Sequence, residues 1–291
     1  MPDAAYLALD WGTTNRRVYA LAADGTLLHR AQDDRGVLAV PAGGYPAEIA
    51  AIRAAHGDLP ILAAGMIGST RGWHDVPYVA APADSAALAS GAVQAGQGVT
   101  ILPGISRCDE SRADVMRGEE VQVFGAIAAG LAPADALFCQ PGTHNKWIVA
   151  EAGTITDFTT AMTGELFALL KAHGILAGML DGPVADGPAF RDGLARGQAG
   201  DLTAALFEIR ASVLLGTRAA EDAASFASGI LIGADAAARR DLAGRTVHLL
   251  GRGALATLYA AAIGEAGART ITIDSETAFL AGIHTLREQL Q

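Results

Sequence analysis

Two short segments of this 291-residue chain combine groups that bind anions. Gly12-Thr13-Thr14-Asn15-Arg16 and Gly142-Thr143-His144-Asn145-Lys146 match at the Gly, Thr, Asn and basic positions. Glycine leaves backbone N–H groups uncovered, and Thr and Asn side chains add donors, so each segment could approach a phosphate closely. Asp10, just before the first segment, could hold a metal ion through water. Two such segments facing each other would grip a polyphosphate from both sides.

The two segments lie in similar surroundings. Each is flanked by apolar runs typical of β-strands, and each is followed by a Gly-containing turn and a further strand. Taken alone, an Asp-x-Gly-Thr sequence is equally compatible with an ordinary hairpin. The repeated order predicts that the chain is internally duplicated. The expected strands are 5–10, 17–21 and 26–31 around the first segment, and 136–139, 147–150 and 154–160 around the second.

The remaining elements alternate in a way that predicts an α/β protein. The break Ala132-Pro133-Ala134-Asp135 is the best candidate domain boundary, so we expect an N-terminal domain over 1–132 and a C-terminal domain over 133–291. We expect breaks at Gly182-Pro183 and Gly187-Pro188 in the largely helical last third. The other expected strands are 61–64, 99–102, 246–250 and 269–273, and the expected helices are 46–55, 119–130, 165–173, 201–215, 218–240, 254–263 and 277–290.

An acidic stretch opens the helix expected at residue 119. Glu119 or Glu120 could accept a proton from a hydroxyl that attacks a phosphoryl group, an effect usually worth ~10²–10⁴-fold. The alternative is a solvated helix start, where acidic side chains are favoured by the helix dipole.

Composition limits the classes of partner. Lys and Arg number 21 against 31 Asp and Glu, a net charge of −10, and no basic run suited to a phosphate backbone is present, so nucleic acid is not expected. The amino end lacks the pattern of a secretory signal, and no apolar run approaches a membrane span. We therefore expect a cytoplasmic protein without membrane contact, in which Cys108 and Cys139 act as small buried hydrophobes. The oligomeric state stays open, a homo-oligomer included.

These features together resemble the actin and hexokinase superfamily. In that superfamily two phosphate loops precede an adenosine element, and His248 to Leu255, with Gly251 and Gly253, is similar to the latter. A dinucleotide fold would also contain Gly-x-Gly, but no complete fingerprint accompanies it here. The resemblance implies two ribonuclease H-like domains facing each other across a cleft, with ATP and Mg²⁺ as cofactors and Asp10 as the main metal ligand. Gln140-Pro141 stands before the second loop where many relatives have an acid, which leaves a second metal ligand in doubt.

Longer strings resemble the 2-dehydro-3-deoxygalactonokinase family. The resemblance implies transfer of the ATP γ-phosphate to the terminal hydroxyl of the sugar acid 2-dehydro-3-deoxygalactonate, giving the 6-phosphate in galactonate catabolism. The strings occur in that family's order and span nearly the whole chain: 65–73, 76–78, 114–120, 141–147, 162–165 and 228–233.

The substrate's carboxylate and hydroxyls call for a guanidinium group and neutral donors. Arg71 is the best placed candidate, with Ser69 nearby and Trp73 as a wall of the site. The alternative for Arg71 is a surface charge, and the alternative for Trp73 is packing in the core. His144 and Lys146 could meet the transferred phosphate, although Lys146 could also be merely solvated. Glu165 could accept sugar hydroxyls or be only an acid in the first turn of a helix.

Three other functions stay open at this point. A polyphosphate or nucleotide phosphatase of the same superfamily is favoured by the Glu119-Glu120 stretch, which is similar to the catalytic helix start of related phosphatases. A kinase for another sugar acid would need only a different pocket. A sugar-responsive nucleotide-binding regulator is the alternative outside the enzymes.

Overall fold

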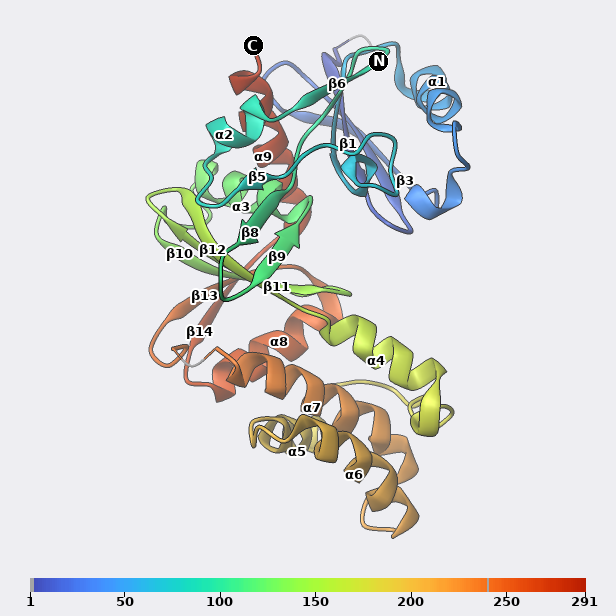
Figure 1. The fold of residues 1–291 in the computed structure, drawn as a ribbon, viewed down its shortest axis with the longest axis vertical. Coiled ribbons are helices and arrows are strands. Elements are labelled where there is room, and N and C mark those ends of the chain that lie inside the picture. The colour runs from blue at the N-terminus through green and yellow to red at the C-terminus, as the bar shows by residue number, and fades with distance from the viewer. Residues whose placement is uncertain (1–2, 240) are drawn as a thin grey trace. The chain divides into compact units, whose positions relative to one another are not determined.

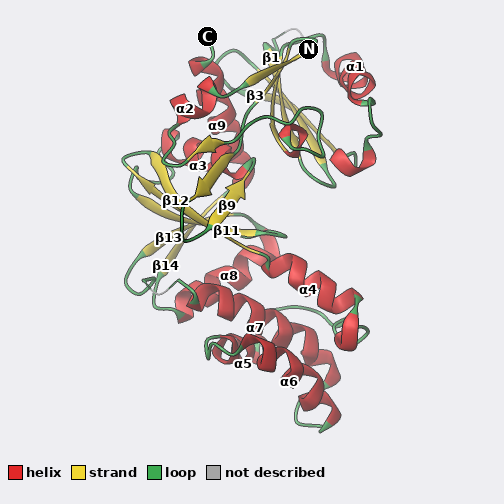
Figure 2. Cartoon of the chain, viewed as in Figure 1, coloured by secondary structure: helices red, strands yellow, loops and turns green. Residues whose placement is uncertain are grey.

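The computed structural model describes residues 3–239 and 241–291, and these form a mixed α/β structure (Figures 1 and 2). The chain divides into two compact units. The first unit contains the described residues of 1–135 together with 149–158 and 275–291, and the second contains 136–148 and the described residues of 159–274. Within these described residues, no helix is long and apolar enough to cross a membrane.

The first unit is built on a six-stranded sheet in the order β3-β2-β1-β4-β7-β6. Strands β1, β2 and β3 form the expected antiparallel hairpins, and β1 then pairs in parallel with β4, and β4 with β7. β6 pairs antiparallel with β7 at the edge. The strands are β1 (Tyr6–Trp11), β2 (Arg16–Leu21), β3 (Leu27–Asp33), β4 (Ile61–Gly65), β6 (Val93–Gly96) and β7 (Val99–Ile101).

Helix α1 (Tyr45–His56) covers the core of this sheet, because Ile49 and Ile52 are buried in one apolar cluster with Leu7, Leu9 and Trp11. Pro46 lies in the first turn of the helix, where its missing N–H has no intrahelical partner to lose. The short helix α2 (Ser85–Ser90) was not expected from the sequence.

The second sheet repeats the order of the first, β12-β11-β10-β13-β14, and β10, β13 and β14 are parallel. A two-residue turn, with φ of 48° at Ala152 and 79° at Gly153, joins β11 to β12 as in a type I′ hairpin. The shared order is what an internal duplication predicts. The strands are β10 (Ala136–Gln140), β11 (Asn145–Glu151), β12 (Thr154–Ala161), β13 (Thr246–Leu250) and β14 (Arg269–Ile273).

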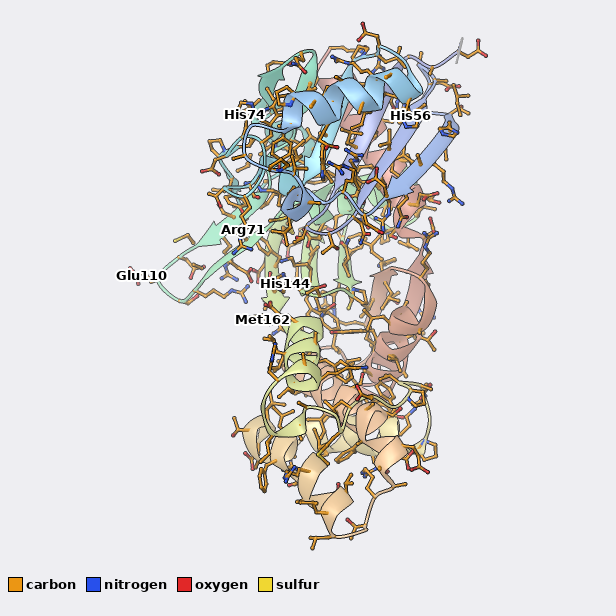
Figure 3. The ribbon with its side chains drawn as sticks, turned by 90° about the vertical axis from the view of Figure 1, so that its right-hand side faces the viewer. His56, Arg71, His74, Glu110, His144 and Met162 are labelled. Atoms are coloured by element: carbon orange, nitrogen blue, oxygen red, sulfur yellow. The ribbon has the colours of Figure 1, made fainter. Side chains whose placement is uncertain are left out.

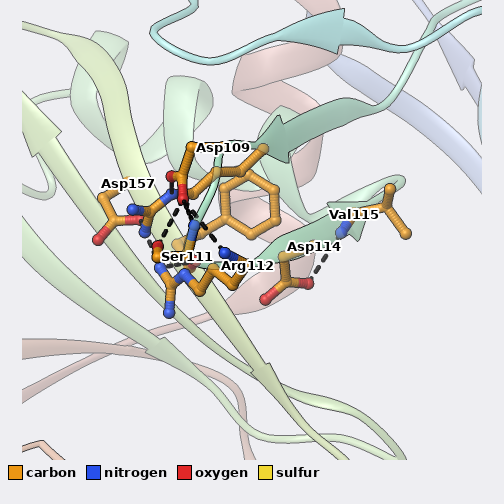
Figure 4. Close-up of polar contacts among 8 residues, drawn as sticks. Asp109, Ser111, Arg112, Asp114, Val115 and Asp157 are labelled. Atoms are coloured by element: carbon orange, nitrogen blue, oxygen red, sulfur yellow. Dashed lines mark hydrogen bonds and ion pairs between the residues drawn. The ribbon is translucent and has the colours of Figure 1, made fainter.

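A small sheet of β5 (Val79–Ala80), β8 (Ile105–Cys108) and β9 (Ala113–Met116) completes the first unit, and Glu110 lies at the tip of its hairpin (Figure 3). Arg112 Nη2 lies 2.6 Å from Asp157 Oδ1 on β12, and Arg107 pairs with the same carboxylate (Figure 4). Ala83 forms a bridge with Ile155. These contacts explain why residues 149–158 group with the first unit.

The last helix, α9 (Ser275–Gln289), also belongs to the first unit, where it packs on α3 (Glu119–Ala128). A Cβ on Gly125 would lie 1.9 Å from Ala278 O, and a Cβ on Gly282 would lie 1.9 Å from Val121 O. Only glycine allows this close approach. The units therefore differ from the expected division at 132/133 in residues 133–135 and in the segments 149–158 and 275–291. Contacts distant in sequence decide where the two longer segments pack.

The second unit carries most of the helices: α4 (Thr163–Ala172), α5 (Pro188–Gly197), α6 (Leu202–Leu214), α7 (Ala223–Ala237) and α8 (Gly253–Glu265). The expected break at Gly187-Pro188 ends at Gly187, and Pro188 begins helix α5, which was not expected from the sequence. The expected helix 218–240 begins only at Ala223, after the 3₁₀ turn Ala220–Asp222, and its expected last residue, Arg240, lies outside the described residues. Both cysteines are free thiols, and Cys139 is buried as expected, whereas Cys108 is exposed.

Candidate active site

The first Gly-Thr segment forms a tight turn between β1 and β2. Gly12 N–H donates to Asn15 O at 2.9 Å, and Asn15 Nδ2 donates to Thr14 Oγ1 at 3.1 Å. Gly36 supports the turn, because a Cβ there would lie 2.3 Å from Thr13 O. The side chains of residues 13–15 remain exposed. The turn is thus fixed on one side and open to an anion on the other.

Asp10 is the penultimate residue of β1, just before this segment, and its side chain is 21% exposed. Burial raises the pKa of Asp10, and Arg17, whose Nη1 lies 2.7 Å from Asp10 Oδ2, acts in the opposite direction. No cluster of three or more His, Cys, Asp or Glu suited to a metal occurs among residues 3–239 and 241–291. A single carboxylate that keeps solvent contact fits Mg²⁺ bound mainly by water and phosphate oxygens.

Helix α3 begins at the same edge of the first sheet. Gly118 precedes it with φ of 106°, and a Cβ on Gly118 would lie 3.2 Å from Gly65 Cα. Gly65 ends β4 and pairs with Trp11, the residue after Asp10. The structure therefore brings Glu119 and Glu120 to the edge that carries Asp10.

The two glutamates differ in environment. Glu120 is fully buried, its Oε1 accepts the Gly118 N–H at 2.7 Å, and its Oε2 is without a partner. Burial, followed by the charge of Glu119, raises the pKa of Glu120 to about 8. Glu119 is partly exposed, and its Oε2 accepts the Arg117 N–H at 2.9 Å. The alternative of a simply solvated helix start does not describe Glu120.

The segment expected to bind the sugar acid, residues 66–78, follows β4 and is called the sugar-acid loop below. Arg71 is exposed (Figure 3), which is compatible with both the expected substrate role and the alternative of a surface charge. Ser69 is buried, and its hydroxyl donates to Met66 O at 2.7 Å, so it stabilises the turn instead of facing solvent. Trp73 stacks on Tyr45 with ring centroids 6.0 Å apart and packs against the core, which agrees with the alternative of core packing.

Arg117 is a residue that the sequence analysis missed. Its side chain is buried, its guanidinium lies 4.2 Å from the centroid of the Tyr78 ring, and its Nη2 donates to Val76 O at 2.8 Å. A Cβ on Gly68 would lie 2.9 Å from Arg117 Nη1. Arg117 therefore holds the sugar-acid loop against the start of α3. A basic residue inside an acidic stretch was the only signal for it in the sequence.

The second Gly-Thr segment rests on the start of α4. A Cβ on Gly164 would lie 2.5 Å from Gly142 O, and Glu165 N–H donates to Thr143 O at 2.9 Å. His144 Nε2 and Glu165 Oε2 are 2.6 Å apart and both side chains are exposed. The exposed Thr143 and His144 thus lie beside a helix amino end, which favours an anion.

Lys146 is buried, and its Nζ donates to Thr160 Oγ1 at 2.7 Å. It is therefore not the solvated lysine of the alternative interpretation. Its position inside the sheet also removes it from the exposed surface that Thr143 and His144 form.

A cavity of about 260 Å³ lies in the second unit beside this segment. Its wall includes Gly142 and Gly164, together with Ala254 and Leu255 in the first turn of α8. Gly251 and Gly253, the expected adenosine turn, link β13 to α8, and Gly253 takes a positive φ of 73° that favours glycine. Phe167, Leu231 and Leu258 make most of the remaining wall apolar, as a flat aromatic base requires.

The repeated sheets and the two Gly-Thr turns give this chain a fold of the actin and hexokinase type. Solved structures with the same fold include an activator of 2-hydroxyisocaproyl-CoA dehydratase from Clostridium difficile with bound ADPNP (TM-score 0.51, 10% identity, covering 98% of this chain and 95% of that one). Component A of the (R)-2-hydroxyglutaryl-CoA dehydratase of Acidaminococcus fermentans is similar (TM-score 0.52, 15% identity, covering 98% and 99%). At these identities the likeness concerns the fold alone.

The particular family follows from closer relatives. A sequence profile of the 2-keto-3-deoxy-galactonokinase family matches residues 10–286. The chain is 36% identical over 288 residues to the 2-dehydro-3-deoxygalactonokinase of Escherichia coli, covering 97% of both. It is 35% identical, with a TM-score of 0.90, to a solved Sinorhizobium meliloti protein provisionally assigned the same activity, covering 97% of this chain and 98% of that one. The chain belongs to the 2-keto-3-deoxygalactonokinase family.

Proposed function

We propose that this protein is a cytoplasmic ATP-dependent kinase that phosphorylates 2-dehydro-3-deoxygalactonate on its terminal hydroxyl in galactonate catabolism. The observation that carries the proposal is that the family match, residues 10–286, includes both exposed Gly-Thr turns and the apolar cavity. Phosphoryl transfer needs mainly positioning and charge stabilisation. The two turns supply hydrogen-bond donors for phosphates, and the cavity supplies a pocket for adenine.

ATP would enter the second unit with its adenine in the cavity and its phosphates towards Thr143 and His144. Gly142 connects the two regions, because it is part of both the cavity wall and the turn. In the first unit, the exposed turn at Gly12 to Asn15 offers donors that suit a phosphate group. Asp10 would hold Mg²⁺ through water, and a metal bound there would neutralise charge on the β- and γ-phosphates.

The sugar acid would lie in the first unit, between the sugar-acid loop and the start of α3. Arg71 would bind the carboxylate, and Arg117 would hold the loop in place. Glu119, or Glu120 in the fraction that is ionised, would accept the proton of the attacking hydroxyl. Glu120→Gln and Glu119→Gln separate these two, because loss of the base should lower kcat by ~10²–10⁴-fold while loss of its neighbour should not.

The first experiment is ADP formation from Mg·ATP with a panel of 2-keto-3-deoxy sugar acids, their parent aldonates, common hexoses and a control without sugar. Turnover that depends on 2-dehydro-3-deoxygalactonate supports the proposal. Phosphate release without any sugar would instead identify a phosphatase, and preference for another acid would reassign the substrate. Nucleotide binding without turnover on any compound would point to a regulator.

A further inference from the structure

A buried carboxylate lies at the centre of the second unit. Asp235, on α7, is 8% exposed and accepts four hydrogen bonds from side chains of four different residues. Trp147 Nε1 donates to its Oδ1 at 3.0 Å. The other three donors reach Oδ2, and they are Asn145 Nδ2 at 2.8 Å, Thr163 Oγ1 at 3.0 Å and Tyr259 OH at 2.8 Å.

All four donors are neutral groups. An ionised carboxylate has only acceptor sites, so it suits a pocket in which every neighbour presents an N–H or an O–H. An amide in its place would turn one donor group towards other donors. The network therefore requires Asp and does not tolerate Asn well, although the two side chains have nearly the same shape.

The donors come from the elements that surround the proposed nucleotide site. Asn145 directly follows the second Gly-Thr turn and is the first residue of β11. Thr163 is the first residue of α4, and its neighbour Gly164 contacts Gly142 in the turn. Tyr259 lies on α8, beyond the Gly251 to Gly253 turn. Thr163 and Tyr259 also line the cavity.

We propose that Asp235 is a positioning residue for nucleotide binding, fixing the second Gly-Thr turn, the start of α4 and the wall of the cavity relative to one another. This inference rests on the proposed function. Asp235 would not touch the nucleotide, because both its oxygens are already occupied. The strand before the second turn, β10, ends at Gln140 and not at an acid. The carboxylate that contacts the second turn is therefore Asp235, which reaches Asn145 from α7.

The test compares full-length wild type with Asp235→Asn, Thr163→Val and Thr163→Ser. Titration calorimetry gives the Kd for ADP, and steady-state kinetics give KM for ATP and for the sugar acid. We expect Asp235→Asn to raise the Kd for ADP and the KM for ATP by about tenfold to a hundredfold, which corresponds to one to two lost hydrogen bonds. The KM for the sugar acid should stay within about twofold. Thr163→Val should show the same pattern, and Thr163→Ser, which keeps the hydroxyl, should lie closer to the wild-type values than Thr163→Val.

Ile209→Ala serves as the control for lost stability, because Ile209 is fully buried in an apolar cluster of the second unit and is not one of the four donors to Asp235, so that removal of its side chain destabilises the fold without removing a hydrogen bond of the network. It should leave both KM values near wild type. Equal changes in both KM values, wild-type ADP affinity in Asp235→Asn, or the same loss in Ile209→Ala would overturn the inference. If Asp235→Asn does not fold, the Thr163 pair decides by the same criteria. Absence of ADP binding by the wild type would refute the proposed function itself.

Discussion

Glu120→Gln should make the folded protein more stable at neutral and mildly alkaline pH. Burial raises the pKa of Glu120 from 4.5 to about 8. The folded state therefore keeps a proton that the unfolded chain has already released, so this group's contribution is full below pH 4.5 and is lost as the pH rises towards 8. Each pH unit in that window lowers the free energy of unfolding by about 1.4 kcal/mol. Between roughly pH 5.5 and 8, the free energy of unfolding of wild type should therefore fall by about 3 kcal/mol relative to that of Glu120→Gln.

Urea denaturation of both proteins at several pH values in this range measures the difference as a change in the free energy of unfolding. Glu119→Gln is the graded comparison. The charge of Glu119 is the second cause of the raised pKa of Glu120, after burial, so its removal should flatten the pH dependence only in part. Parallel curves for wild type and Glu120→Gln would mean that Glu120 is ionised in the folded protein, and the argument from its burial would be refuted.

Three further outcomes follow from the geometry. Gly282→Ala should destabilise the protein by about 1–3 kcal/mol or more in thermal unfolding, because the new Cβ would lie 1.9 Å from Val121 O. Gly264→Ala on α8 is the control and should be neutral or stabilising, because no atom lies within 4 Å of its new Cβ. Asp10→Asn should lower kcat at saturating Mg·ATP by ~10²-fold or more, and unchanged turnover would exclude it as the metal ligand. Arg71→Ala should raise the KM for the sugar acid by about tenfold and leave the KM for ATP unchanged, and the reverse pattern would assign Arg71 to the nucleotide.

Local patterns predicted most of the strands and helices, because alternation, Gly-containing turns and helical spacing are properties of neighbouring residues. Pro188 shows the limit of such reasoning, since proline both interrupts helices and begins them. The place of α9 in the first unit depends on Gly125 and Gly282, which lie far apart in the sequence and meet only after folding. No local pattern encodes that pairing.

Within the candidate site, the sequence predicted which turns would be exposed but not which way each side chain would face. Ser69 and Lys146 both stand beside exposed glycine-rich turns, yet both donate to groups within their own unit. Arg117, in contrast, was not expected to take part in the site. It holds the sugar-acid loop through contacts with Gly68 and Tyr78, which approach it only in the folded structure. The type of residue sets its chemistry, and packing decides whether that chemistry faces a ligand.

The two repeats have diverged in how each uses its carboxylate. In the first, Asp10 stands before the Gly-Thr turn, contacts Arg17 and keeps solvent contact, so it remains able to meet a metal. In the second, Gln140 occupies the end of the strand, and the carboxylate comes from Asp235 on a helix and holds Asn145 from behind. In the proposed nucleotide site, a second exposed acid would add negative charge next to the ATP phosphates, whereas the buried Asp235 accepts hydrogen bonds and fixes the turn. Under the proposed function, the first repeat would hold the metal and the second the nucleotide, which is a division that a symmetric pair of hairpins could not provide.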